Sequence, residues 1–180
     1  MASINGFQMK NIHRTRGREG YGVTASMYLD GTRIGTYADY ADGGPADVEY
    51  FNQQNKEVFE RFLIDYAEKH PIDYIVENIY NNEQRFEEDK KSFLSYHPHI
   101  KPEKVTKNSL SGFGADIIAD EFLELFDLEQ EYKQAVKKGY RGISYDGAII
   151  VSYPADWSDE QITKDANGSD IYLSPVDFVK

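Results

Sequence analysis

The chain has 180 residues, of which 40% are apolar and none is cysteine, and its formal net charge at pH 7 is −11. The missing thiols exclude a disulfide framework, a thiolate metal site and a catalytic cysteine. The negative charge disfavours nucleic-acid binding across the whole surface and suits a basic partner surface, although solubility alone is the plainer explanation. No apolar run reaches membrane-spanning length, so we expect no membrane partner and a cytoplasmic location. The start does not resemble a signal peptide, and Met9 could be the natural first residue, with residues 1–8 an added segment.

The first predicted structure is a β-hairpin that turns at Asp30-Gly31. Residues 23–29 alternate apolar and polar side chains, and an Asp-Gly pair suits a two-residue turn with positive φ at both positions. This turn predicts three cross-strand pairs: Tyr28 with Arg33, Met27 with Ile34, and Ala25 with Thr36. The face predicted to enter the core carries Val23, Ala25, Met27, Leu29, Ile34, Ala38 and Tyr40. The face predicted to be exposed carries Tyr28, Arg33, Tyr37 and Asp39.

Strands and helices are expected to follow this hairpin in turn. Residues 46–51 can add a third strand, and residues 7–17 can form an edge strand. Apolar residues at helical spacing predict helices over residues 52–69, 72–79 and 83–96. A short helix can begin near Pro102. A long helix is predicted from about residue 113 to residue 138, with Gly139 as its C-terminal stop.

The C-terminal region predicts a second hairpin. Asp146-Gly147 reads as another two-residue turn, which would pair Ile143 with Ile150 and Tyr140 with Tyr153. Residues 171–179 can add a short edge strand. The class is therefore α+β, with an antiparallel sheet from N- and C-terminal hairpins and a central helical region. We expect one domain over residues 1–180, made of a hairpin region (10–51), a helical region (52–138) and a C-terminal hairpin and tail (139–180).

Five carboxylates form a predicted stripe on the long helix. Their spacings of four, four, three and four residues place them opposite its apolar side, over about 22 Å of helix axis. Neighbours would lie roughly 5–6 Å apart, which resembles the phosphate spacing of a nucleic-acid strand. The stripe consists of Asp116, Asp120, Glu124, Asp127 and Glu131. The alternative is that the stripe is only a solvated acidic face. Two other glutamates of this helix, Glu121 and Glu129, fall toward its apolar side, either at the rim of that side or buried.

A second acidic group lies at the far end of the first hairpin. Asp39, Asp42, Asp47 and Glu49 stand among aromatic residues that include Tyr37. They could form one edge of an acidic contact surface, or they could hold Mg²⁺ in a metal-dependent phosphodiesterase or nuclease. Their spacing matches no calcium loop and no Asp…Glu-x-Lys nuclease pattern, so the contact surface is the preferred interpretation. We predict no cofactor.

Two further patterns have a functional and a plainer interpretation. His97 and His99 have the spacing of metal ligands, but prolines surround them and no third ligand is near, so we interpret them as a loop feature. Arg14, Arg16 and Arg18 lie in the only basic cluster, which could bind single-stranded nucleic acid by charge and tyrosine stacking. The plainer expectation is that these arginines pair with the protein's own carboxylates.

The segment KNIHRTRGREGYGVTASMYLDGTRIGTYADYADGGPADVEY, followed by an acidic helical middle, resembles short accessory proteins of phages and mobile elements in Gram-positive bacteria. Some of these are type II-A anti-CRISPR proteins, which inhibit the RNA-guided DNA nuclease of the host. The likeness is most specific over residues 10–50 and extends more loosely to about residue 153. It supplies no catalytic residues. It implies a protein partner, the nuclease–guide RNA complex, whose nucleic-acid channel is strongly basic.

These observations predict a non-enzymatic inhibitor. It would bind the host nuclease–guide RNA complex through the helix stripe and the acidic hairpin, and impede DNA binding or cleavage. Two alternatives stay open. One is a metal-dependent phosphodiesterase that uses Asp39, Asp42, Asp47 and Glu49, and the other is a small nucleic-acid-binding module that uses the N-terminal arginines.

Overall fold

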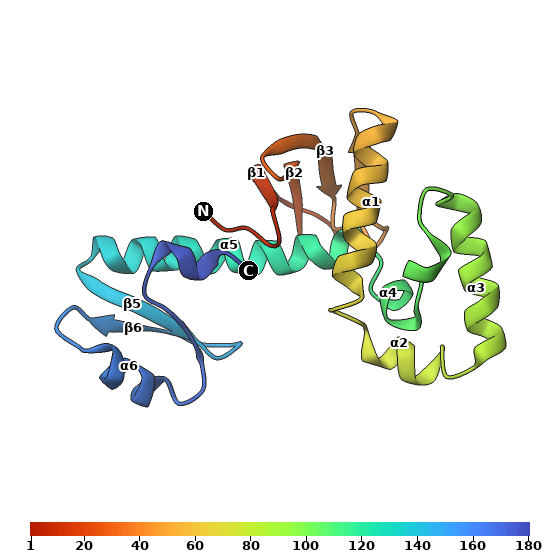
Figure 1. Cartoon of the computed structure of the whole chain (residues 1–180). Coiled ribbons are helices and arrows are strands. Elements are labelled where there is room, and N and C mark those ends of the chain that lie inside the picture. Colours follow the sequence, from red (N-terminus) through yellow and green to blue (C-terminus); the bar gives the residue numbers. More distant parts are fainter. The chain divides into compact units, whose positions relative to one another are not determined.

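The computed structural model describes all 180 residues and has an α+β fold (Figure 1). Its strands form two antiparallel sheets, one of four strands and one of three, rather than the one sheet that we predicted. Each sheet is made of strands that are close in sequence, which is the commoner outcome because short connections favour local pairing. The chain forms two compact units, residues 9–119 and residues 1–8 with 120–180, which are described separately.

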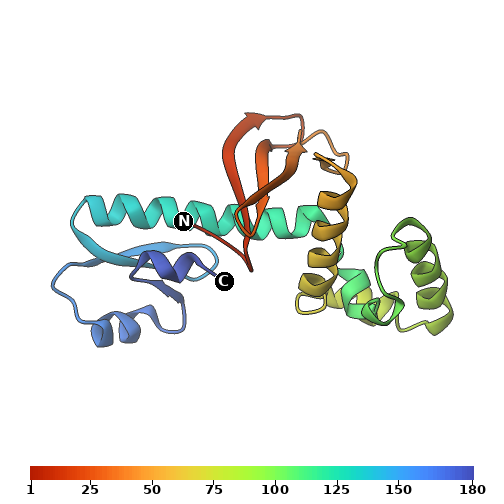
Figure 2. The same ribbon diagram turned by 45° about the horizontal axis from the view of Figure 1, so that its top comes forward.

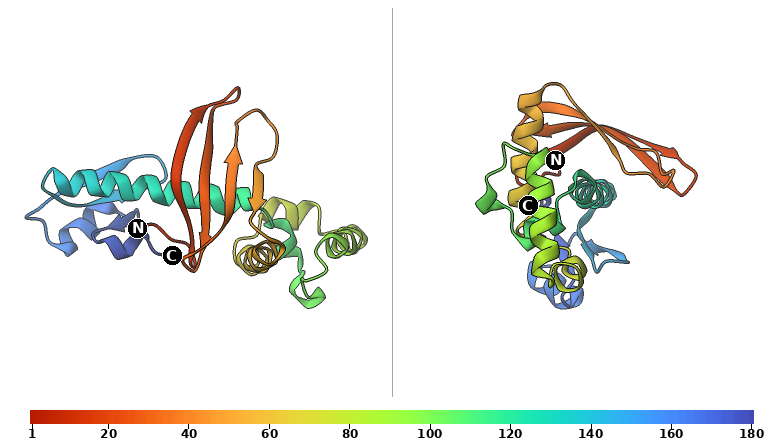
Figure 3. Two further views of the ribbon diagram at one scale, coloured as in Figure 1. Left: turned by 90° about the horizontal axis from the view of Figure 1, so that it is seen from above. Right: turned by 90° about the vertical axis from the view of Figure 1, so that its right-hand side faces the viewer.

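The unit of residues 9–119 contains a twisted four-stranded sheet in which each strand pairs with the next along the chain (Figure 3). Its first strand is at the edge of the sheet, as predicted. The strands are β1 (Phe7–Arg16), β2 (Tyr21–Leu29), β3 (Thr32–Asp39) and β4 (Asp47–Tyr50).

The turn between β2 and β3 is confirmed, but the register beyond it is not the predicted one. Asp30 and Gly31 have φ of 48° and 76°, and Tyr28 pairs with Arg33. An irregularity between Met27 and Tyr28 then shifts the pairing by one residue, so the predicted pairs of Met27 with Ile34 and Ala25 with Thr36 are wrong. The observed pairs are Met27 with Gly35 and Ala25 with Tyr37.

This shift reverses the predicted position of Tyr37, because side chains alternate between the faces of a strand. Tyr37 was expected on the exposed face, but it is buried with an exposed fraction of 3%. Tyr40 was expected in the core, but it is 55% exposed. Tyr37 therefore does not lie on the surface, where we had placed it as a partner-binding residue.

Helices follow the sheet close to the predicted positions. They are α1 (Gln53–Ala67), α2 (Asp73–Asn78), α3 (Glu83–Tyr96), η1 (Pro102–Lys104) and α4 (Lys107–Ser111). The side chain of Asn52 caps α1 by accepting a hydrogen bond from the Asn55 N–H. Helix α1 packs beside β3 and β4 and buries Phe59 and Leu63 (Figure 2). The helices that follow bury little, since α2 has no buried residue and α3 has only Phe86.

The other unit is built on the C-terminal part of the chain. Its elements are α5 (Ala115–Lys137, of which residues 120 onward belong to this unit), β5 (Tyr140–Tyr145), β6 (Ile150–Pro154), α6 (Asp159–Ala166), β7 (Asp170–Tyr172) and η2 (Pro175–Phe178). The predicted long helix and the C-terminal edge strand are confirmed, and β5 is the central strand between β6 and β7.

The second hairpin has a longer loop than predicted. Tyr145 pairs with Ile150, so residues 146–149 form the loop. The predicted pairs of Ile143 with Ile150 and Tyr140 with Tyr153 are both wrong. The Asp146 carboxylate accepts hydrogen bonds from the N–H groups of Ala148 and Ile149 at 3.0 and 2.8 Å. An aspartate side chain that bonds to the following backbone stabilises a wider turn, which explains the difference.

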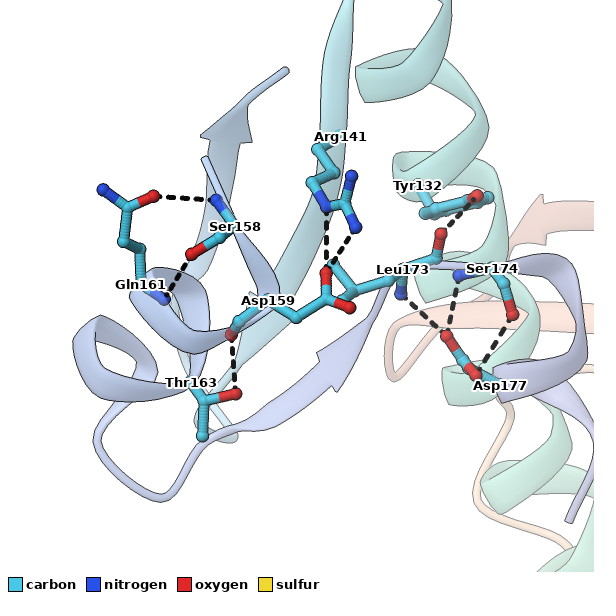
Figure 4. Close-up of polar contacts among 9 residues, drawn as sticks. All are labelled: Tyr132, Arg141, Ser158, Asp159, Gln161, Thr163, Leu173, Ser174 and Asp177. Carbon is cyan, nitrogen blue, oxygen red and sulfur yellow. Dashed lines mark hydrogen bonds and ion pairs between the residues drawn. The ribbon is translucent and has the colours of Figure 1, made fainter. Parts of the chain in front are cut away.

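Helix α6 was not predicted, although its first residues carry a recognisable signal. The Ser158 hydroxyl accepts a hydrogen bond from the Gln161 N–H, and the Gln161 side chain accepts one from the Ser158 N–H (Figure 4). This reciprocal pair is a capping box, which marks a helix start in the sequence. In the same region Arg141 of β5 pairs with Asp159 at the start of α6 (Figure 4).

The first residues of the chain are part of this unit's core. The backbone of Ser3 pairs with Val179 as a parallel bridge, and Phe7 packs edge-on against Phe122 at 5.8 Å. Ala2, Ile4 and Phe7 are all buried. The side chains of Ala2, Ile4 and Phe7 therefore form part of this unit's core.

Candidate functional site

The carboxylate stripe on α5 is largely exposed, as predicted. Asp116, Asp120, Glu124 and Glu131 are exposed, and Asp127 is half-buried. Asp116 belongs to the unit of residues 9–119 and the other four to the C-terminal unit. Within the C-terminal unit alone, the four carboxylates from residue 120 to residue 131 extend over about 16 Å of helix axis at the helical rise.

The structure gives Glu124 a neighbour from the C-terminal sheet. A hydrogen bond between the Tyr145 hydroxyl and the Glu124 carboxylate raises the pKa of Tyr145 above its ordinary value, and burial and the negative charges nearby act in the same direction. Glu124 therefore presents its negative charge from a defined position.

The two glutamates outside the stripe have different environments. Glu121 is half-buried, and its carboxylate lies 3.4 Å from Lys180 Nζ. Glu129 is buried, and its carboxylate lies 2.8 Å from the Met1 ammonium and 3.0 Å from Lys133 Nζ and accepts a hydrogen bond from the Ala2 N–H. Glu129 therefore holds the first residues of the chain to α5 and is not a solvent-facing group.

The acidic hairpin residues are not brought together at one point. Asp47 and Glu49 are exposed on β4. Asp39 and Asp42 form hydrogen bonds with the backbone two residues further on. The Asp39 carboxylate accepts one from the Ala41 N–H at 2.7 Å, and the Asp42 carboxylate accepts one from the Gly44 N–H at 3.2 Å. The group of converging ligand atoms that the structure contains includes none of these four carboxylates.

An open groove of about 590 Å³ crosses the four-stranded sheet. Asp47 and Glu49 line it together with His13 and the hydroxyl groups of Ser26 and Thr36. The groove has both polar and apolar lining residues, and the two β4 carboxylates contribute negative charge to it.

The N-terminal arginines Arg14, Arg16 and Arg18 are exposed at the end of β1 and in the loop that follows it. Earlier in the same strand the ammonium group of Lys10 lies over the Tyr28 ring, 4.4 Å from its centroid. This contact is a cation–π interaction within the protein, so a lysine already covers one face of the Tyr28 ring.

A third group of side chains was not predicted as a site. Glu60 of α1, His97 at the C-terminal cap of α3, and His99 in the following turn have ligand atoms within 4.8 Å of one another. Glu60 Oε2 lies 3.0 Å from His97 Nδ1 and 2.9 Å from His99 Nε2. Both histidines lie in the loop after α3, as predicted, but the expectation that no third ligand is near them is wrong.

Two sequence signals could have indicated this group. The His-x-His spacing was recognised, and Glu60 occupies a helix position whose neighbours one turn onward, Leu63 and Ile64, are buried core residues. A carboxylate on the buried side of a helix requires a partner. The sequence did not indicate that residues 97–100 fold back and pack against α1.

Comparison with known proteins identifies no relative: no family model, no curated protein and no solved structure matches the chain significantly. No helix in the structure combines the length and the apolar character that crossing a membrane requires.

Proposed function

We propose that this protein is a non-enzymatic inhibitor that binds the host's RNA-guided type II CRISPR nuclease in complex with guide RNA. The acidic surface of α5 would occupy a basic nucleic-acid channel of the nuclease and impede DNA binding or cleavage. The observation that carries the proposal is the exposure of the like-charged stripe, with Glu124 and Glu131 about two turns apart on a single helix face.

The energetics of the stripe support a role beyond solubility. Like charges four residues apart on a helix cost about 0.2–0.5 kcal/mol per pair, and a surface made only for solubility would usually mix signs. Neither Glu131 nor Asp116 forms an ion pair with a lysine or arginine of the chain. These carboxylates are therefore free to meet cationic groups of a partner, as phosphates do in the channel.

The β4 carboxylates Asp47 and Glu49 could add a second acidic contact from the other unit. They are exposed and line the groove on the four-stranded sheet. Long-range attraction between such groups and a basic channel accelerates association and makes it sensitive to salt. We therefore expect inhibition to weaken as ionic strength rises.

The test uses a purified type II nuclease–guide RNA complex and a matching DNA target. The stripe variant combines Asp116→Asn, Glu124→Gln and Glu131→Gln, which removes three charges from the stripe. The control combines Glu77→Gln, Glu87→Gln and Glu88→Gln, which removes three exposed charges from α2 and α3. We expect at least a roughly tenfold weaker inhibition by the stripe variant, which corresponds to about 1.4 kcal/mol, and little change in the control.

The outcomes separate the alternatives. Equal loss in both variants would mean that only net charge matters, and absence of inhibition by the wild-type chain would overturn the proposal. Cleavage of the DNA by the wild-type chain alone in the presence of Mg²⁺ would favour the phosphodiesterase alternative. Binding of the wild-type chain to single-stranded DNA at low salt would favour the nucleic-acid-binding module.

A further inference from the structure

We propose that Glu60, His97 and His99 form a binding site for a divalent first-row transition-metal ion, which joins α1 to the end of α3. All three residues lie in the unit of residues 9–119. The proposal concerns the stability of this unit and does not depend on the inhibitor function. Zn²⁺ is the representative ion.

The directions of the three polar groups are the first argument. Glu60 Oε2 is 2.9–3.0 Å from both imidazole nitrogens, which is hydrogen-bonding distance. Nevertheless none of these three atoms has a partner with hydrogen-bonding geometry, and all three are buried from solvent. The ring nitrogens therefore point to one side of the carboxylate oxygen rather than at it.

Such an arrangement is what ligands of a common ion produce. Two atoms that are each about 2.1 Å from one ion are about 3.0 Å apart at a right angle and about 3.4 Å apart in a tetrahedron. The observed 2.9 and 3.0 Å match the right angle, which occurs in five- and six-coordinate sites. Two imidazoles and one carboxylate suit Zn²⁺, Fe²⁺ and their neighbours, whereas Mg²⁺ and Ca²⁺ prefer oxygen ligands.

Packing holds one of the ligands in place. The His97 ring stacks on Phe93 at 4.3 Å between centroids and meets Phe113 edge-on at 5.2 Å. These contacts restrict the rotation of the imidazole before any ion binds. A site whose ligands are already oriented binds an ion more tightly, because less side-chain entropy is lost.

Burial and charge give a reason for an ion at this place. Glu60 is only 5% exposed, and a buried carboxylate without a well-directed partner is costly. The nearest lysine ammonium, that of Lys56, lies 3.8 Å from the other carboxylate oxygen. A divalent cation beside Oε2 would compensate the charge directly.

The fully buried core of the same region is small. Helix α2 has no buried residue and α3 has one, and only three buried residues form the local hydrophobic cluster: Ile64, Ile100 and Val105. Small cores of this kind gain stability from a metal that links separate elements. An ion bound to Glu60, His97 and His99 would tie the loop that carries Ile100 to α1.

The experiment begins with the full chain treated with a chelator, dialysed and titrated with Zn²⁺ in a calorimeter. We expect one ion per chain and a rise in Tm of roughly 5–10 °C when free Zn²⁺ is about 100 times the Kd. Substitution by Co²⁺ should give visible absorption that reports imidazole ligation. In NMR spectra, Zn²⁺ should shift the ring signals of His97 and His99 and leave those of His13 and His70 unchanged.

Variants then assign the ligands. His99→Gln should lower the Zn²⁺ affinity by more than the roughly 10–100-fold typical of losing a group that only supports a ligand. His13→Gln, which alters an exposed histidine of β1, is the matched control and should bind as wild type does. Absence of one-to-one binding by the wild-type chain would overturn the proposal. Unchanged affinity in His99→Gln, or an equal loss in His13→Gln, would also overturn it, and the NMR shifts decide the case if a variant does not fold.

Discussion

Replacing Glu129 by glutamine should destabilise the C-terminal unit more than any substitution in the exposed stripe. The Glu129 side chain is 2% exposed. Its carboxylate oxygens bind donor groups from the first residues of the chain and from α5. Oε1 is 2.8 Å from the Met1 ammonium and 3.0 Å from Lys133 Nζ, while Oε2 accepts from the Ala2 N–H at 3.1 Å. A glutamine has only one acceptor oxygen, so its NH₂ group must face one of these donors in either orientation.

The magnitude follows from the contacts that are lost. Hydrogen bonds to a charged group contribute about 1.5–3 kcal/mol, and a buried donor without a partner costs about 1–3 kcal/mol. Because the amide still fills the space and keeps one hydrogen bond, we expect a net loss of about 2–4 kcal/mol in the free energy of unfolding at pH 7. Glu121→Gln is the control, since its contact with Lys180 is only partly buried, and it should cost less than about 1 kcal/mol.

The effect should also depend on pH. Burial by itself would raise the pKa of the Glu129 carboxyl, but the hydrogen bonds from the N-terminal ammonium, Lys133 and the Ala2 N–H outweigh burial and hold this pKa below its ordinary value of 4.5. Because the pKa is lower in the folded state than in the unfolded state, the ionised carboxylate stabilises the fold at pH values above its ordinary pKa. That stabilisation is lost as the pH falls through the folded-state pKa.

Urea unfolding of wild type and variant at a series of pH values measures this difference. The two stabilities should differ by the full amount at pH 6–7 and should converge as the pH falls below about 4. A difference that is the same at pH 7 and pH 3 would refute the role assigned to the charge. A loss no larger than that of Glu121→Gln would refute the assignment of Glu129 as a buried anchor.

Two further substitutions test the fold. Tyr37→Ala should cost about 3–5 kcal/mol in urea unfolding, because the bulge places this ring in the core. Tyr40→Ala should cost less than about 0.5 kcal/mol, because this ring is exposed beyond the end of β3. The reverse order would favour the register predicted without a bulge. Gly142→Ala should lower the stability by about 1–3 kcal/mol, because a Cβ there would lie 2.5 Å from the Tyr172 carbonyl oxygen across the β5–β7 pair, and a thermal unfolding curve equal to that of wild type would contradict this pairing.

The helices and turns that could be predicted depend on neighbours in the sequence. Asp30-Gly31 favours a two-residue turn wherever it stands between alternating strands, and this turn is present. The helical spacing of apolar residues indicated α1 and α5 within a few residues of their observed ends. Exposure of the α5 stripe followed from the same periodicity, since carboxylates opposite an apolar face remain in solvent.

Features that join distant segments were decided by the tertiary structure. The bulge at Met27/Tyr28 places Tyr37 in the core, and no local preference of these residues indicated the extra residue. The strands of the two ends pair within their own regions, so two sheets form where one was expected. Glu129 and the first residues of the chain find each other only after folding.

The Glu60, His97 and His99 group also depends partly on the local sequence and partly on the tertiary structure. Sequence by itself determined that two histidines stand two residues apart and that a glutamate lies among the apolar positions of a helix. The tertiary structure decided that these side chains meet, because the turn after α3 folds back and packs Ile100 against Ile64 of α1. Periodicity reports which face of an element is buried, but only the packing of whole elements determines which buried polar groups face one another.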